Sequence, residues 1–186
     1  SLWGIRIEGG NKVSVDERMV HDIVQKVMAN MQISGSVSGM HGVFKDMNDA
    51  INASIEAQKK VCTMTLDQRE QIISLIRKKT HENAEILANM GVNETGMGNV
   101  GDKILKHHLT ADKVPGTEDI STIAWSGDRG LTLVEMGPFG VIGAITPATN
   151  PSETVICNCI GMLAGGNTVV FNPHPAAIKT SIYAIN

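Results

Sequence analysis

The feature that most constrains the fold of this chain is a pair of short apolar runs, Val141–Thr146 and Thr168–Phe171. Each run is typical of a strand that is buried on both faces of a parallel sheet. The segment between them has the composition of a helix, so the chain leaves one strand, crosses over and returns as the next. The pattern therefore predicts a right-handed strand, helix, strand unit and an α/β fold.

Both ends of the segment between the strands carry helix signals. Pro151 is tolerated at a first helical position, and Asn150 before it is a plausible cap. Gly165 and Gly166 can end the helix, because glycine accepts positive φ. We therefore expect a helix that begins at Pro151 and ends at the glycine pair.

Units of this kind bind ligands at the carboxyl ends of their strands, where amides at a helix start can face a phosphate or an oxyanion. Here those ends are residues 146–150 and 172–175. The glycine-rich dinucleotide fingerprint is missing, since Gly137, Gly140 and Gly143 precede the end of the first strand instead of following it. Spacing alone leaves two interpretations open, a nucleotide site and a purely structural unit.

The chain before this unit is mostly of helical pattern. In order, the expected elements are a helix over 43–61, a helix capped by Thr65 and Gln68 and closed by Gly91, a shorter helix over about 101–110, an irregular segment over 112–130 and a strand over 131–136.

The first forty residues form a separate tail in this interpretation. Six apolar residues at helical spacing give one face of a helix over 15–32, and a Ser/Gly-rich linker follows it. They are Val20, Ile23, Val24, Val27, Met28 and Met31. Such a helix can dock on a partner as a unit, or it can pack on its own domain, and both interpretations stay open.

Composition excludes several classes of protein. The formal net charge is −3 and the basic residues are scattered, which argues against a nucleic-acid partner. No apolar run reaches the length of a membrane span, and no secretory signal is visible, so we expect a cytoplasmic protein without a membrane partner. The odd set Cys62, Cys157 and Cys159 argues against a disulfide framework.

The cysteine and histidine pairs do not predict a metal site. Cys157 and Cys159 lie two residues apart on the expected helix and point to different sides, so core packing explains them better. The adjacent His107 and His108 diverge in the same way and are expected to be surface or half-buried residues. His81 stands alone in the sequence and is expected to be solvated.

The residues around both strands resemble those of the aldehyde dehydrogenase superfamily. The runs PFGVIGAITPATNP and AGGNTVVFNPHPAA are similar to its CoA-acylating branch, and the Asn-Pro-His-Pro run resembles acylating enzymes of bacterial microcompartments. The likeness spans 43–186 and includes LDQREQIISLIRKKT, NETGMG and KVPGTEDI. It implies a partial Rossmann-like nucleotide-binding domain over 41–186, after a tail over 1–40. The implied oxidoreductase converts a short aldehyde such as propionaldehyde or acetaldehyde, with NAD and coenzyme A, to acyl-CoA.

The resemblance also implies site residues. Thr149 stands where the family's oxyanion-stabilising Asn usually sits, and Asn150 supplies an amide one position later. We interpret Asn150 as the catalytic donor, with Thr149 as one alternative and a helix-capping role for Asn150 as another. The candidate cofactor contacts are Ile145, Thr146, Pro147, Asn172, Pro173 and His174.

The second strand end departs from the family pattern. Asn172 and Pro175 replace the usual Lys and Glu that hold the adenosine ribose, which leaves the choice between NAD and NADP open. His174 becomes a candidate contact for ribose or phosphate.

The resemblance further implies that the nucleophilic cysteine lies downstream of residue 186, because none of the three cysteines fits that role. We therefore expect an N-terminal part without its catalytic domain, inactive alone. The strand over 131–136 resembles an extension that pairs between subunits, which implies a homo-oligomer. A rival hypothesis is a non-catalytic assembly piece that works through helix 15–32. That helix resembles encapsulation tails, which implies a microcompartment shell protein as partner and the microcompartment lumen as location.

Overall fold

The computed structural model describes residues 42–186, so the expected helix 15–32 and its linker lie outside the described residues. The helices are α2 (Met47–Val61), α3 (Leu66–Thr95), α4 (Val100–Lys113), α5 (Pro151–Ala164) and α6 (Ile178–Ile185), with 3₁₀ turns η1 (Thr117–Asp119) and η2 (Pro175–Ala177). The strands are β1 (Ile123–Gly127), β2 (Gly130–Val134), β3 (Val141–Thr146) and β4 (Thr168–Pro173).

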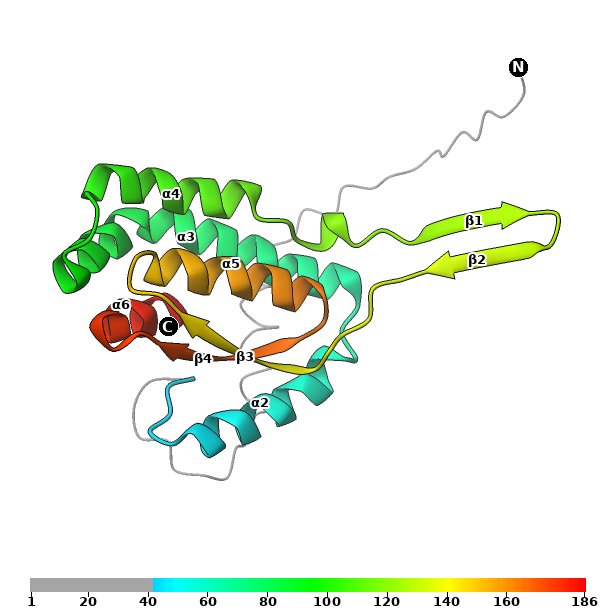
Figure 1. The fold of residues 1–186 in the computed structure, drawn as a ribbon, viewed down its shortest axis with the longest axis horizontal. Helices are drawn as coiled ribbons and strands as arrows, with labels where there is room; N and C mark the ends of the chain where they lie inside the picture. Colours follow the sequence, from blue (N-terminus) through cyan, green and yellow to red (C-terminus); the bar gives the residue numbers. More distant parts are fainter. Residues whose placement is uncertain (1–41) are drawn as a thin grey trace, which may run out of the picture. The chain divides into compact units, whose positions relative to one another are not determined.

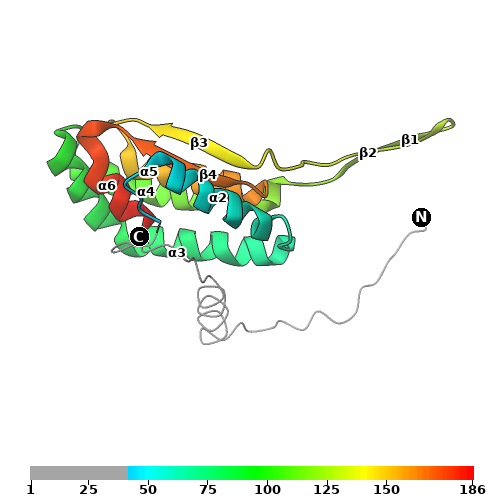
Figure 2. The same cartoon turned by 90° about the horizontal axis from the view of Figure 1, so that it is seen from below.

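The predicted crossover unit is present and forms the centre of this part of the chain. Strand β3 runs parallel to β4, with Val141 opposite Thr168 and Thr146 opposite Pro173, and α5 connects the two strands. Helices α2 and α5 lie on opposite sides of the strands, and α3 packs against α5 (Figures 1 and 2). The prediction of an α/β fold is confirmed.

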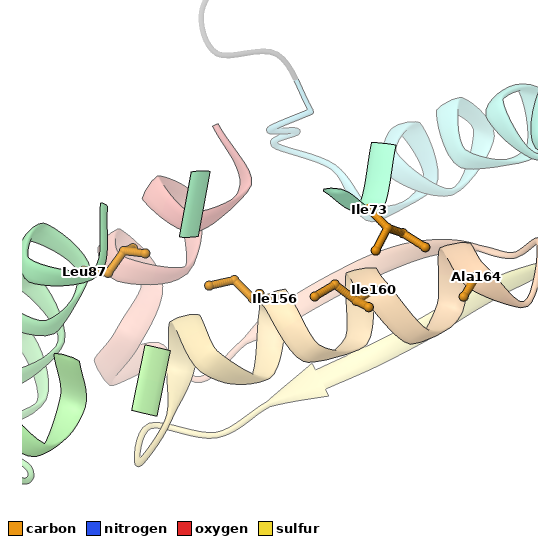
Figure 3. Close-up of a cluster of buried hydrophobic side chains, with 5 residues drawn as sticks. All are labelled: Ile73, Leu87, Ile156, Ile160 and Ala164. Carbon is orange, nitrogen blue, oxygen red and sulfur yellow. The ribbon is translucent and has the colours of Figure 1, made fainter. Parts of the chain in front are cut away.

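The core lies between α3 and α5. Five buried side chains form one cluster, in which the residues of α5 face those of α3 (Figure 3). They are Ile73, Leu87, Ile156, Ile160 and Ala164. On α5 these side chains recur every four residues and so form one face, and that face is covered by α3.

The prediction that β3 is buried on both faces is wrong. Its side chains alternate, so that Ala144 and Thr146 are 7% and 1% exposed while Ile145 between them is 84% exposed. Among the described residues β3 pairs with β4 alone. A purely apolar run does not predict burial of both faces, because periodicity does not show whether a second layer covers a strand.

Helix α3 begins as predicted but ends later. Thr65 accepts a hydrogen bond from the amide of Gln68 and Gln68 bonds back to the amide of Thr65, which completes the predicted capping box. The helix runs past Gly91 to Thr95, and Gly96 closes it at φ +67°. Gly91 is buried inside the helix, where a methyl group would lie 3.8 Å from the Lys103 side chain. That distance is an ordinary van der Waals contact, so Gly91 packs beside Lys103 and does not end the helix.

The segment after α4 is less irregular than predicted. Residues 123–127 form β1, which pairs antiparallel with β2 in a hairpin that projects away from the helices (Figures 1 and 2). Every residue of both strands is exposed, although the larger apolar residues alternate with smaller or polar ones at Ile123 and Trp125 and at Leu131 and Leu133. The expected boundaries also shift, since α2 begins at Met47 behind the cap Asp46 and α4 extends to Lys113.

The glycine pair ends α5 as predicted, although only Gly166, at φ +78°, uses the left-handed region. In the part of the chain that the structure describes, no helix is long and apolar enough to cross a membrane.

Candidate active site

The two strand ends that the sequence singled out lie side by side. Ile145 is opposite Asn172 and Thr146 is opposite Pro173, and the amide of His174 donates to the carbonyl of Thr146 over 3.1 Å. The parallel register therefore brings the predicted cofactor residues 145–147 and 172–174 to one edge. Ile145, Asn172 and His174 are exposed there, while Thr146 is buried.

His174 is held in one orientation by the turn that follows it. Its Nδ1 accepts a hydrogen bond from the amide of Ala176 over 3.1 Å and so caps η2. An acceptor nitrogen carries no proton, so the neutral ring has its proton on Nε2. His174 therefore presents an N–H donor at the exposed edge.

Asn150 is the N-cap residue of α5, as predicted, and its carbonyl accepts the first helical hydrogen bond from the amide of Thr154 over 3.1 Å. Its side chain makes no capping hydrogen bond, and its Oδ1 instead accepts from Nζ of Lys106 over 3.2 Å. The prediction of a side-chain cap is therefore wrong, because the amide oxygen that such a cap requires is bonded to the α4 lysine. The neighbouring Thr149 is exposed, and its carbonyl accepts from Nζ of Lys103 over 2.9 Å.

The buried Lys103 of α4 supports this turn. Lys103 is 3% exposed, and its ammonium lies 3.5 Å from a carboxylate oxygen of Glu153, which is also buried. A cation near the positive end of a helix dipole is unfavourable, and Glu153 in the first turn of α5 offsets it. Removal of one partner from a buried ion pair typically costs about 3–5 kcal/mol, so the pair ties α4 firmly to the start of α5.

His107 is the member of this support that sequence reasoning missed. The ring is fully buried, with Nδ1 2.7 Å from the carbonyl oxygen of Lys103 and Nε2 2.8 Å from Oγ of Ser152. A carbonyl only accepts, so Nδ1 carries the proton and Nε2 accepts from the Ser152 hydroxyl. Burial lowers the pKa of His107 below its ordinary value, which favours this neutral form.

The expectation of a surface or half-buried His107 is therefore wrong. The available signal was the spacing of Lys103, Lys106 and His107, at i, i+3 and i+4, which puts all three on one face of α4.

The sequence suggested that His81 stands alone, but in the structure it contacts two residues of α4. Its ring stacks on His108 with centroids 4.9 Å apart, the two Nδ1 atoms are 2.7 Å apart, and its Nε2 lies 2.8 Å from Asp112. These partners lie on α3 and α4, so the contact depends on helix packing. Within residues 42–186 no group of three His, Cys, Asp or Glu side chains is arranged to hold a metal ion.

The cysteines lie away from the turn. Cys157 is exposed and Cys159 half-buried, and they lie about 10 Å and about 13 Å along the α5 axis from Asn150. Burial raises the pKa of the Cys159 thiol to about 12, so it stays protonated at neutral pH. Because the thiolate is the reactive form, Cys159 is a packing residue.

Comparison with known proteins agrees with this geometry. The sequence model of the aldehyde dehydrogenase family matches residues 13–186. The chain belongs to the aldehyde dehydrogenase family. The predicted family resemblance is thereby confirmed.

Relatives within the family are similar over most of the chain. An acetaldehyde dehydrogenase (acetylating) from Bilophila wadsworthia is 46% identical over 178 residues, which is 91% of this chain and 36% of that protein. The structure of a propionaldehyde dehydrogenase from the Clostridium phytofermentans fucose utilisation bacterial microcompartment is 78% identical, with a TM-score of 0.75 over 77% of this chain and 33% of that one.

A third relative was solved with a ligand. Rhodopseudomonas palustris propionaldehyde dehydrogenase with bound propionyl-CoA is 49% identical, with a TM-score of 0.75 over 77% of this chain and 32% of that one. The chain thus spans about a third of the length of each of these relatives.

Proposed function

We propose that this chain contributes one wall of the active site of a CoA-acylating aldehyde dehydrogenase, which converts a short aldehyde, CoA and NAD to acyl-CoA and NADH. The observation that carries the proposal is the Asn150 amide. It lies at the start of α5, at the edge where the two strand ends meet, and Lys106 occupies its oxygen. The high identity to acetaldehyde and propionaldehyde dehydrogenases supports the substrate class.

In this proposal Asn150 stabilises the charge that develops on the aldehyde oxygen when a thiolate adds to the carbonyl carbon. A side-chain N–H aimed at such an oxygen acts without reorganisation during the reaction. The amides at the start of α5 add a positive potential at the same place. Thr149 remains the alternative donor, since its hydroxyl lies one residue earlier in the same exposed turn.

The strand-end residues 145–147 and 172–174 would contact the nicotinamide dinucleotide, which accepts the hydride when bound, while CoA takes the acyl group. The Nε2–H of His174 is a suitable donor to a ribose hydroxyl or a phosphate. Asn172 is exposed beside it and can also donate. Either residue tolerates a 2′-phosphate as well as a hydroxyl, so the choice between NAD and NADP stays a question for binding measurements.

The β1–β2 hairpin supports a homo-oligomer. Apolar side chains lie on both faces of a two-stranded ribbon, which is marginally stable by itself in water. The larger ones are Ile123, Trp125, Leu131, Leu133 and Val134, between 45% and 64% exposed. A second subunit that covers them would complete a sheet and a core.

We also propose that helix 15–32 directs the enzyme to a microcompartment shell protein. The support is its apolar face in the sequence and the origin of the 78% identical relative in a microcompartment. Residues 14–40 fused to a fluorescent protein should give puncta in cells that make the compartment. A Val24→Glu, Met28→Glu version should be diffuse. Diffuse signal from both fusions would overturn the targeting proposal and leave the helix to pack on its own enzyme.

The test of the main proposal is NADH formation by the full-length enzyme. Propionaldehyde, NAD and CoA together should give NADH, and omission of CoA should abolish steady NADH formation. The 186-residue chain alone should give no turnover, because none of its cysteines lies at the turn. Turnover by that chain near the full-length rate, or full-length activity that ignores CoA, would overturn the proposal.

A further inference from the structure

One face of α4 is directed at the start of α5, and it is cationic. Lys103 and Lys106 lie three residues apart and His107 four residues after Lys103, so all three side chains share this face. Helices α4 and α5 lie next to each other (Figure 1), which brings the two lysines to the turn before α5. Such a concentration of donors at a helix start needs acceptors, and the turn supplies them.

The two lysines take different acceptors. Lys103 donates to the main-chain carbonyl of Thr149 over 2.9 Å, and Lys106 donates to the side-chain Oδ1 of Asn150 over 3.2 Å. Lys103 therefore holds the backbone of the turn, and Lys106 holds the amide that projects from it.

The stem of Lys103 packs beside two glycines. Methyl groups built at Gly91 and Gly98 would lie 3.8 Å and 3.4 Å from its side-chain carbons. Because Lys103 is also paired with Glu153 and buried, it has little freedom to move away from the Thr149 carbonyl. The backbone at the turn is thus fixed before any ligand arrives.

Lys106 decides which end of the Asn150 amide points away from α4. An ammonium group has three donors and no acceptor, so only the amide oxygen can face it. The NH₂ group must then lie on the opposite side, and among residues 42–186 it has no hydrogen-bond partner. A reversed amide would place N–H groups against the ammonium and direct an oxygen towards a developing oxyanion.

We propose that Lys106 is a positioning residue that directs the Asn150 N–H donors towards the substrate oxyanion, while Lys103 holds the backbone of the same turn. This inference rests on the proposed function, since it assigns the orientation of the proposed donor. Lys106 acts through Asn150 and does not contact the reacting atoms.

The experiment is a double-mutant cycle in the full-length enzyme. Lys106→Met should lower kcat about tenfold, with KM for CoA and NAD and the melting temperature unchanged, because Lys106 is an exposed residue. Lys106→Arg should restore most of the loss, since it keeps a donor. In an Asn150→Ala background, Lys106→Met should change kcat less than twofold, because no amide remains to be directed.

The matched control is Lys113→Met, which removes an exposed lysine from the last turn of the same helix and should leave kcat unchanged. An unchanged kcat in Lys106→Met would overturn the inference while the proposed function stands. Equal losses in both backgrounds would also overturn it, because Lys106 would then act independently of Asn150. Absence of CoA-dependent turnover in the unmodified enzyme would overturn the proposed function, and this inference with it.

Discussion

The turn before α5 and the β1–β2 hairpin differ in polarity and in how the rest of the chain supports them. The turn is polar and short, and the buried Lys103 and His107 of α4 bond to it and to the first turn of α5. The hairpin is apolar and projects from the helices, and no buried side chain supports it (Figure 1). The hydrogen bonds that hold the turn come from other residues of 42–186, whereas the apolar side chains of the hairpin are exposed.

We therefore expect the turn to affect catalysis and the hairpin to affect subunit association. A catalytic donor must be oriented before the substrate arrives, so its supports belong to the same subunit. An exposed apolar ribbon gains stability only when another surface covers it. Substitutions in the turn should therefore change kcat, and substitutions in the hairpin should change subunit association.

The largest effect is expected at the turn. Asn150→Ala in the full-length enzyme should lower kcat by roughly 10² to 10³, because an oxyanion donor is lost. Oligomer mass should not change. Steady-state kinetics and light scattering check both expectations. If Thr149→Ala lowers kcat and Asn150→Ala does not, then the oxyanion donor is Thr149 and not Asn150.

The second effect is expected at the hairpin. Leu131→Asp with Leu133→Asp puts two charges on one face of β2 and should weaken subunit association by about 30-fold or more, as loss of an interface hot spot does. Sedimentation at several protein concentrations measures it. Thr132→Asn, on the opposite face of the same strand, is the control and should leave association nearly unchanged. Association that survives the double substitution would show that the hairpin is not the interface.

A smaller effect is expected at the buried histidine behind the turn. His107→Leu removes the 2.8 Å partner of the Ser152 hydroxyl, which keeps only a longer contact of 3.3 Å to Glu153, and should lower the free energy of unfolding by roughly 1–3 kcal/mol. Urea unfolding of the chain at neutral pH measures this loss.

The same histidine predicts a pH dependence. Burial lowers its pKa in the folded state below the ordinary 6.5, so the unfolded state binds more protons between the two values. This contribution to stability is present above pH 6.5 and is lost as the pH falls through the folded-state pKa. His107→Leu should flatten that part of the stability curve. An unchanged slope in the variant would show that another group titrates.

The smallest effect is expected at a second anchored helix start, far in sequence from the turn. Glu94 accepts from the amides of Lys179 and Thr180 at the start of α6. Glu94→Gln should cost about 1 kcal/mol of stability, as loss of a helix cap does, and should leave kcat unchanged. A large kcat loss in Glu94→Gln would mean that any disturbed helix start reduces activity, so that the effect would not be specific to the turn before α5.

Local signals predicted a large part of this fold. The crossover unit, the capping box at Thr65 and the end of α5 at Gly166 all depend on residues close together in the chain. Hydrophobic period, cap chemistry and glycine conformation act within a few residues, so a sequence displays them directly. The same signals located both strand ends, whereas the roles assigned to the residues of the candidate site came from the family resemblance.

Packing decided what those signals could not show. The sequence did not reveal that Lys106 meets Asn150, 44 positions away, or that His107 is fully buried against Ser152. The irregular segment expected over 112–130 also contained β1, a short strand of five residues whose partner in the structure is β2. These features depend on which helix lies against which. The same lysine on an isolated helix would be solvated, and only the approach of α4 to α5 turns it into a hydrogen-bond partner.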